Sequence, residues 1–256
     1  MRLLIAFLKL ILIIISTILF YLIISLGLFF SLIGLKGRKW MAYFLSIWAS
    51  LICRIINVDV NVEGKVPKPP FFLVSNHLSY LDVFVMLSKT SSVFIAKNEI
   101  LSWPIFGFMS HTVGMLFVDR DKRSDVKRVN NQISKRISEA QGILLFPEGT
   151  TTNGSKILPF KASLLAYPAE NNMPVNYATL RYSTPRNEKL ATDFVCWWND
   201  TPFLTHFINL LKLNKIEATI QFGSESIVNS DRKELARSLY KNASEQFTPV
   251  INSQAK

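Results

Sequence analysis

The chain has 256 residues, of which 29 are Lys or Arg and 18 are Asp or Glu, so its formal net charge at pH 7 is +11. This length is enough for one large domain, or for a domain with an appendage, and the charge favours anionic partners such as lipid headgroups, phosphorylated ligands or acidic carrier proteins. The two cysteines, Cys53 and Cys196, have neither metal-ligand spacing nor a disulfide framework, which argues against a disulfide-stapled fold and favours a reducing compartment. Nucleic-acid binding is disfavoured, because no recognised motif accompanies the charge.

Residues 10–35 form an uncharged apolar run, LILIIISTILFYLIISLGLFFSLIGL. About 20 apolar residues are enough to cross the hydrocarbon core of a bilayer, whereas the apolar region of a secretory signal is roughly 7–15 residues long. We therefore predict a retained membrane segment rather than a cleaved signal. Three positive charges follow the run and two precede it, which favours a cytoplasmic location for the rest of the chain.

A second apolar segment, WMAYFLSIWASLICRIINV, covers residues 40–58. Its two tryptophans suit a helix at the membrane interface, and a buried core helix fits the same pattern. Two topologies are therefore open: the segments span the bilayer, or they enter one leaflet as a helical hairpin. We assign residues 1–57 to an N-terminal membrane segment and residues 58–256 to a globular domain.

Strand-like runs alternate with helical patterns from Val58 onward. The runs are rich in Val, Ile and Phe and most of them end at Gly, Pro or Asn; they are residues 58–62, 71–75, 93–96, 115–118, 143–146, 175–181, 194–198 and 218–222.

Apolar residues recur every three or four positions over residues 125–141, which predicts a helix with Ser124 as its cap and Gly142 at its end. A last helix is expected over residues 231–247. The alternation of strands and helices predicts the α/β class, with a central mostly parallel or mixed sheet flanked by helices and preceded by the hydrophobic N-terminal helix or hairpin.

One of the three histidines, His77, follows directly after the predicted strand over residues 71–75, and Asp82 comes five residues later. Active groups of open α/β sheets gather at the carboxyl ends of the strands. On one continuous helix the two side chains would lie about 140° apart and face away from each other. They can meet if His77 lies in a turn and Asp82 lies in the first turn of a helix capped by Ser79.

This spacing has two interpretations. In the first, Asp82 only caps the helix and His77 is an ordinary loop residue. In the second, Asp82 accepts a ring N–H from His77 and leaves the other ring nitrogen as a base towards a hydroxyl group. The sequence has no G-x-S-x-G nucleophile elbow and neither cysteine has a favourable context, so the substrate itself would supply that hydroxyl.

Four ordered blocks stand out between about residues 58 and 182. The first is NHLSYLD, with the spacing His-x4-Asp. The second is AKNEILSWPIFGFM followed by GMLFVDR, the third is FPEGTTTNG followed by LPFKASLL, and the fourth is MPVNYATLRY. Together these blocks resemble the 1-acylglycerol-3-phosphate acyltransferase family, and the hydrophobic N-terminal segment also fits that family.

The resemblance implies transfer of a fatty acyl group from acyl-CoA or acyl carrier protein to the free hydroxyl of 1-acylglycerol 3-phosphate, giving phosphatidate. His77 would act as general base and Asp82 would orient it. No cofactor, metal or covalent acyl-enzyme is implied, and His111 and His206 are isolated in the sequence. The implied location is the cytoplasmic face of a bacterial inner membrane, with the lysolipid, the acyl donor and membrane lipids as partners and no nucleic acid.

The resemblance also implies a set of substrate-binding residues. A phosphate close to the reacting hydroxyl calls for cations nearby, and a Pro-Glu-Gly turn would shape the acceptor pocket. Solvated surface cations and a purely structural turn are the alternatives. The implied residues are Asn76, Lys97, Arg120, Glu148, Gly149, Thr150 and Lys161.

Two positions depart from the family pattern. Thr151 replaces an arginine that helps to hold the acceptor phosphate, and Tyr177 stands near the place of a second proline. These departures, together with the stretch CWWNDTPFLTHFINLL, resemble members that acylate other lysophospholipids or lyso-ornithine lipids. A different acceptor is therefore the first alternative. A membrane-anchored module that binds anionic lipid without catalysis is the second.

Overall fold

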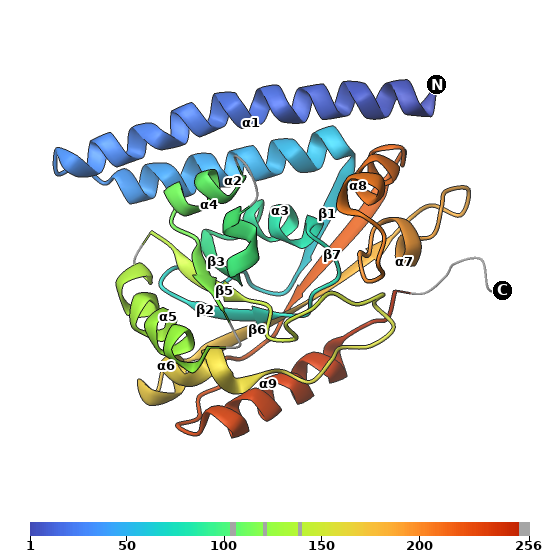
Figure 1. The fold of residues 1–256 in the computed structure, drawn as a ribbon. Helices are drawn as coiled ribbons and strands as arrows, with labels where there is room; N and C mark the ends of the chain where they lie inside the picture. Colours follow the sequence, from blue (N-terminus) through green and yellow to red (C-terminus); the bar gives the residue numbers. More distant parts are fainter. Residues whose placement is uncertain (103–105, 120–121, 138–139, 251–256) are drawn as a thin grey trace.

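The computed structural model describes residues 1–102, 106–119, 122–137 and 140–250. Within these residues a seven-stranded sheet with the order β1-β7-β6-β2-β5-β3-β4 forms the centre of the molecule (Figure 1). Every neighbouring pair is parallel except β6 and β7, which are antiparallel, so the predicted mixed sheet is confirmed. The strands are β1 (Val58–Glu63), β2 (Phe72–Ser75), β3 (Ser92–Lys97), β4 (Leu116–Val118), β5 (Gly142–Leu145), β6 (Val175–Ser183) and β7 (Ile216–Phe222).

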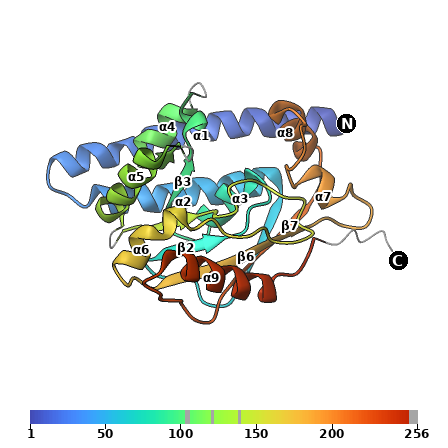
Figure 2. The ribbon, with the colours of Figure 1, turned by 60° about the horizontal axis from the view of Figure 1, so that its bottom comes forward.

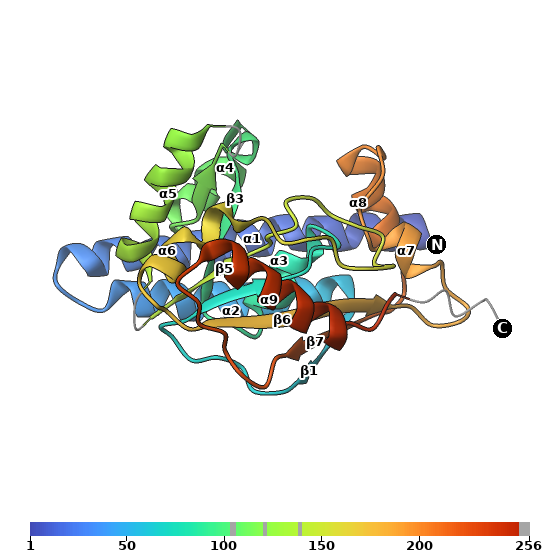
Figure 3. The same cartoon turned by 90° about the horizontal axis from the view of Figure 1, so that it is seen from below.

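Helices cover both faces of this sheet (Figures 1 and 3). On one face lie α2 and α3, with α1 outside α2, and on the other face lie α5, α6 and α9. The helices are α1 (Arg2–Leu32), α2 (Gly37–Ile56), α3 (Leu81–Leu87), α4 (Phe106–Thr112), α5 (Arg123–Arg136), α6 (Ala166–Glu170), α7 (Ala191–Phe194), α8 (Phe203–Leu211) and α9 (Arg232–Gln246), with 3-10 turns η1 (Asn98–Ser102) and η2 (Ala162–Leu165).

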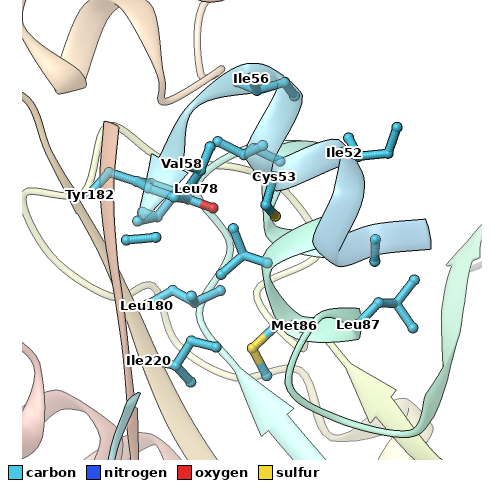
Figure 4. Packing of buried hydrophobic residues seen from close by; sticks show 14 of the residues in the cluster. Ile52, Cys53, Ile56, Val58, Leu78, Met86, Leu87, Leu180, Tyr182 and Ile220 are labelled. Atoms are coloured by element: carbon cyan, nitrogen blue, oxygen red, sulfur yellow. The ribbon is translucent and has the colours of Figure 1, made fainter. Parts of the chain in front are cut away.

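The central strand β2 is buried along its whole length because it lies between β6 and β5 and is covered on both faces. Its side chains alternate between two cores: Leu73 joins the cluster under α2 and α3, whereas Phe72 and Val74 join the cluster under α5 and α9. Figure 4 shows part of the first of these clusters, which includes Ile52 and Ile56 of α2. Burial on both faces explains why three consecutive residues of β2, Phe72 to Val74, are apolar rather than alternating with polar ones.

The N-terminal helix α1 lies along α2 rather than away from the domain. At its N-terminal end Arg2 pairs with Glu188 at 3.3 Å, and Lys9 Nζ donates to the carbonyl oxygens of Ile56 and Leu213 at 3.0 and 2.9 Å. Both α1 and α2 are long and apolar enough to cross a membrane. Since polar contacts hold the start of α1 against the domain and α2 packs on α3, the two helices form a hairpin along the protein.

Seven of the eight predicted strands are present, with ends that differ by a few residues, and one prediction is wrong. Residues 194–198 do not form a strand: Phe194 ends α7, and the backbone N–H groups of Val195 and Cys196 fold back to donate to the carbonyl of Ala191 at 3.0 and 2.9 Å. A five-residue apolar run fits a buried turn of helix as well as a strand, so its pattern could not separate the two.

The predicted helix ends are confirmed at one helix and wrong at another. The side chain of Asp231 caps α9 by accepting from the backbone N–H groups of Lys233 and Glu234. By contrast, α5 begins at Arg123 rather than after Ser124, and the Lys122 side chain before it makes no capping hydrogen bond. The helix ends at Arg136, before the predicted end, and the backbone of Ile137 is extended.

Candidate active site

The carboxyl ends of the five neighbouring parallel strands β6, β2, β5, β3 and β4 lie at one edge of the sheet, as expected for a site in an open α/β fold. The turn that contains His77 follows β2, the turn that contains Glu148 follows β5, and Lys97 ends β3. These residues lie in separate parts of the sequence, and the strand order β2-β5-β3 brings them to the same edge.

His77 and Asp82 are in direct contact. The Nδ1 atom of His77 lies 2.7 Å from Oδ2 of Asp82, which is in the first turn of α3. The side chain of Asp82 is fully buried, whereas 22% of the His77 side chain is exposed. An ionised carboxylate only accepts hydrogen bonds, so Nδ1 donates its hydrogen to Oδ2 of Asp82.

Asp82 also holds the backbone of the turn. Its Oδ2 atom accepts from the backbone N–H groups of Leu78 at 2.7 Å and Ser79 at 3.1 Å, and the Ser79 hydroxyl accepts from the backbone N–H of Leu81 at 3.3 Å. The two interpretations of the His-x4-Asp spacing are therefore not exclusive. One carboxylate closes the start of the helix and contacts the imidazole, because the same turn brings both to it.

The aromatic side chain of Phe146 supports the imidazole ring. The rings of His77 and Phe146 are stacked, with centroids 4.1 Å apart and an interplanar angle of 8°. Phe146 in turn stacks on Phe94 at 5.8 Å. With one ring face covered and Nδ1 held by Asp82, the imidazole has little freedom to turn.

Glu148 ties the two turns together through backbone groups. Its Oε1 atom accepts from the backbone N–H of His77 at 2.7 Å, and its Oε2 atom accepts from the backbone N–H of Leu158 at 2.9 Å. Burial raises the pKa of Glu148 to about 7; the two N–H donors lower it, and the negative charge of Asp82 raises it further. This carboxyl is 2% exposed and fixes the backbone of His77, and its contact with an acceptor stays a prediction.

The turn after β5 requires glycine at one position. Gly149 has φ 79°, in the left-handed region where other L-residues are disfavoured. The following Thr150 is exposed, and the backbone N–H of Lys161 donates to the carbonyl of Pro147 at 2.9 Å while its side chain is exposed. Lys97 is exposed as well. The side chains of Lys97 and Lys161 are therefore accessible to solvent at or beside the edge of the sheet that holds the site.

Asn76 links two strands through its side chain, and its contact with substrate stays a prediction. It is 1% exposed, and its amide both donates to and accepts from the backbone of Leu180 in β6, at 3.0 and 2.7 Å. Its polar atoms therefore join two strands at the site edge. The expectation for Arg120 lies outside the described residues.

The segment after α7 packs against the His77 turn. The Thr151 hydroxyl donates to the carbonyl of Trp197, and the backbone N–H of Trp197 donates to the carbonyl of Leu78 at 2.8 Å. The nearby His206 is buried, with Tyr80 Oη 2.9 Å from Nδ1 and the Cys196 carbonyl 3.1 Å from Nε2, and burial lowers its pKa. His206 is thus a satisfied core histidine.

Sequence reasoning missed two residues that contact the dyad. Phe146 could have been noted because it begins the FPEG block. Tyr182, whose hydroxyl donates to Oδ1 of Asp82 at 2.7 Å, ends the fourth block and gave no signal of this contact. In the part of the chain that the structure describes, no group of three or more His, Cys, Asp or Glu side chains is placed to hold a metal ion.

Comparisons with known proteins find similar acyltransferases. Residues 57–176 match the family model described as Acyltransferase. The chain is 27% identical over 230 residues to the lyso-ornithine lipid O-acyltransferase of Rhizobium meliloti (strain 1021), covering 80% of this chain and 74% of the relative. It is 33% identical over 138 residues to the 1-acyl-sn-glycerol-3-phosphate acyltransferase of Neisseria gonorrhoeae, covering 52% and 54%.

A solved structure has the same fold. The crystal structure of the 1-acyl-sn-glycerophosphate acyltransferase PlsC from Thermotoga maritima matches with a TM-score of 0.62 and 20% identity, over 93% of this chain and 97% of that one. The apolar N-terminal helices and these relatives indicate a protein associated with membranes. Over residues 57–176 the chain is therefore similar to acyltransferases, and the relatives that it matches include 1-acylglycerol-3-phosphate and lyso-ornithine lipid acyltransferases.

Proposed function

We propose that this protein is an O-acyltransferase that moves a fatty acyl group from a thioester donor to the free hydroxyl of a lysolipid, with His77 as general base and Asp82 as its orienting partner. The observation that carries the proposal is the 2.7 Å contact between the ring of a partly exposed histidine and a fully buried carboxylate. Such a pair leaves one basic nitrogen at the surface in a fixed direction.

In the proposed reaction Nε2 of His77 takes the proton of the lipid hydroxyl while the hydroxyl oxygen attacks the thioester carbonyl. The C–O bond forms, the C–S bond breaks, and the thiolate leaves with the proton that His77 returns. The negative charge of Asp82 stabilises the imidazolium between the two proton transfers. The donor is acyl-CoA or acyl carrier protein, whose thiol is the leaving group, and no cofactor takes part.

The test is the change of His77 to alanine. We expect His77→Ala to lower thiol release from acyl-CoA plus lysolipid by about 10²–10⁴-fold, the range for loss of a general base. His111→Ala, which removes an exposed histidine on α4, is the matched control and should keep full activity. Turnover of His77→Ala within threefold of the wild type, in protein that is folded by circular dichroism, would remove the proposal.

For the acceptor we propose a lyso-ornithine lipid. Thr151 offers no cation for a phosphate monoester and its hydroxyl is engaged by the carbonyl of Trp197. The relative of 27% identity over most of the chain is a lyso-ornithine lipid O-acyltransferase. A second candidate is 1-acylglycerol 3-phosphate, favoured by Lys97 and Lys161 at or beside the site edge and by the Neisseria relative. Under this second reading the two lysines and Arg120 hold the phosphate.

The acceptors are separated by measuring kcat/KM for both lipids in one detergent preparation, with a Thr151→Arg variant alongside. We expect the wild type to prefer the lyso-ornithine lipid and Thr151→Arg to shift the ratio towards 1-acylglycerol 3-phosphate, since a guanidinium pairs bidentately with phosphate. Faster turnover of 1-acylglycerol 3-phosphate by the wild type would instead select the second candidate.

For its location we propose that the protein lies on the cytoplasmic leaflet, with α1, α4 and α8 towards the lipid. In Figure 2 these three helices line the same upper side of the molecule. The Tyr21 hydroxyl of α1 lies 3.0 Å from that of Thr112 on α4, and both α4 and α8 expose apolar side chains: Phe108 is 69% and Leu204 64% exposed. Exposed apolar groups that continue a membrane segment are typical of an interfacial surface.

An environment-sensitive fluorophore on a single introduced cysteine tests this location, because both native cysteines are buried. Phe108→Cys and Leu204→Cys should give a blue-shifted, brighter signal on adding vesicles. Val228→Cys is the control, since Val228 is 50% exposed but lies away from the proposed lipid-facing helices. The preceding residue, Ile227, pairs with Val175, the first residue of β6. Equal, water-like signals at all three positions would contradict the orientation.

A further inference from the structure

The side chain of Tyr182 lies inside the molecule, directly behind the dyad. It comes from β6, is 2% exposed, and packs in the cluster that includes Ile56, Val58 and Leu78 (Figure 4). Its hydroxyl donates to Oδ1 of Asp82 at 2.7 Å. Tyr182 is 100 residues from Asp82 in the sequence, and it reaches the carboxylate because β6 is the neighbour of β2 in the sheet.

The two oxygens of Asp82 are held in different ways. Oδ2 accepts from the ring of His77 and from the backbone of Leu78 and Ser79, whereas Tyr182 is the one donor to Oδ1 among the described residues. The terminal torsion of an Asp side chain is soft, so a carboxylate held at one oxygen can rotate about its last bond. A donor at the second oxygen fixes the plane of the carboxylate, and with it the direction in which Oδ2 meets the imidazole.

The surroundings of Tyr182 keep its hydroxyl a donor. Burial raises the pKa of Tyr182 well above its usual value, and the negative charge of Asp82 acts in the same direction. The titratable groups that face this pair are the thiols of Cys53 and Cys196 on the side of Tyr182, and His77 and Glu148 on the side of Asp82. The phenol of Tyr182 therefore stays protonated at neutral pH.

We propose that Tyr182 is a positioning residue for the catalytic base: by fixing Asp82 it keeps His77 in the Nδ1–H tautomer with Nε2 free for the acceptor hydroxyl. Tyr182 touches neither substrate nor the reacting atoms. The kinetic consequence rests on the proposed function of His77, whereas the effect on the tautomer does not.

The kinetic test is Tyr182→Phe, which removes one oxygen atom from a buried ring. We expect kcat to fall about 10–100-fold, as for other groups that orient a functional side chain through one intermediate residue, with each KM changed less than threefold. The acid limb of the pH–rate profile should move to higher pH, because a carboxylate with one donor fewer holds the imidazolium more strongly. Tyr177→Phe on the same strand, whose ring lies in the core on the other face of the sheet, is the matched control.

The second test needs no turnover. In protein labelled with ¹⁵N-histidine, with the His77 signals identified by His77→Ala, the wild type should show a protonated Nδ1 and an unprotonated Nε2, and Tyr182→Phe should show a mixture of tautomers. The proposal is overturned if Tyr182→Phe keeps the wild-type tautomer and the wild-type pH profile. This holds even if kcat falls because less of the variant protein is folded. If the wild type transfers no acyl group but the tautomer responds to Tyr182→Phe, then the proposed function fails and this inference stands.

Discussion

Two buried carboxylates stand on either side of His77, and they do different work. Asp82, in the turn after β2, accepts from the imidazole ring, from two backbone N–H groups and from a tyrosine hydroxyl. Glu148, in the turn after β5, accepts from backbone N–H groups alone, one of them that of His77 itself. In the proposed reaction the first carboxylate orients the imidazole through its ring N–H, whereas the second acts only on the backbone of the same residue. The comparison teaches that two buried carboxylates close to one histidine can have different contacts and therefore different roles.

The largest effect is expected for Asp82→Asn. The amide keeps the shape of the side chain but removes the charge that stabilises the imidazolium, so we expect kcat/KM to fall by about 10²–10⁴-fold. The matched control is Asp59→Asn, the same change at an exposed position of β1. If Asp82→Asn kept a tenth or more of the wild-type activity while Glu148→Gln lost more, then the roles of the two carboxylates would be reversed.

A smaller loss of activity, of about tenfold, is expected for Glu148→Gln, since the amide cannot accept from both backbone donors. The sharper readout is stability against pH. The pKa of Glu148 is raised from 4.5 to about 7 in the folded protein. The folded state therefore binds the proton of Glu148 more tightly than the unfolded state does. Protonated Glu148 thus adds to the free energy of unfolding below about pH 4.5, and this contribution is lost as the pH rises through 7.

The stability that the raised pKa of Glu148 contributes at low pH is on the order of 3 kcal/mol. Thermal unfolding at pH 5 and pH 8 measures it: the wild type should lose more stability than Glu148→Gln over this range, because glutamine does not ionise. Parallel curves for the two proteins would show that Glu148 is already ionised in the folded state at pH 5. The two backbone donors would then outweigh burial.

The smallest effect is expected for Gly149→Ala. Its φ of 79° makes a side chain unfavourable by about 1–2 kcal/mol, so the turn after β5 should loosen and activity should fall by several-fold. Gly34→Ala is the control: Gly34 has φ 77° in the turn between α1 and α2, and a methyl group there would meet nothing within 4 Å. Both variants should lose similar stability by thermal unfolding, but Gly34→Ala should keep its activity. Equal losses of activity would mean that the turn itself has no special role.

Part of the fold could be predicted because its signals are local. The apolar run at the start of β2 and the polar residues that follow it mark a buried strand that ends at a site, and Asp231 marks the start of α9. The failure at residues 194–198 has a physical cause, since a short apolar run is compatible with any buried backbone and Cys196 is held by a turn of helix. The predicted cap at Ser79 was wrong by one residue, because α3 begins at Leu81 after Tyr80, although the backbone N–H of Ser79 does donate to Asp82. Only the tertiary structure shows that the same carboxylate holds this turn and contacts His77.

The sequence by itself determined the features that act over a few residues: the apolar length of α1, the five-residue spacing of His77 and Asp82, and the glycine that a left-handed turn requires. The tertiary structure decided which distant groups meet there. Glu148 lies 71 residues from His77 and Tyr182 lies 100 residues from Asp82, and both reach the site because β2 pairs with β5 on one side and with β6 on the other. Strand order depends on how whole faces pack together, a property that no short stretch of residues carries.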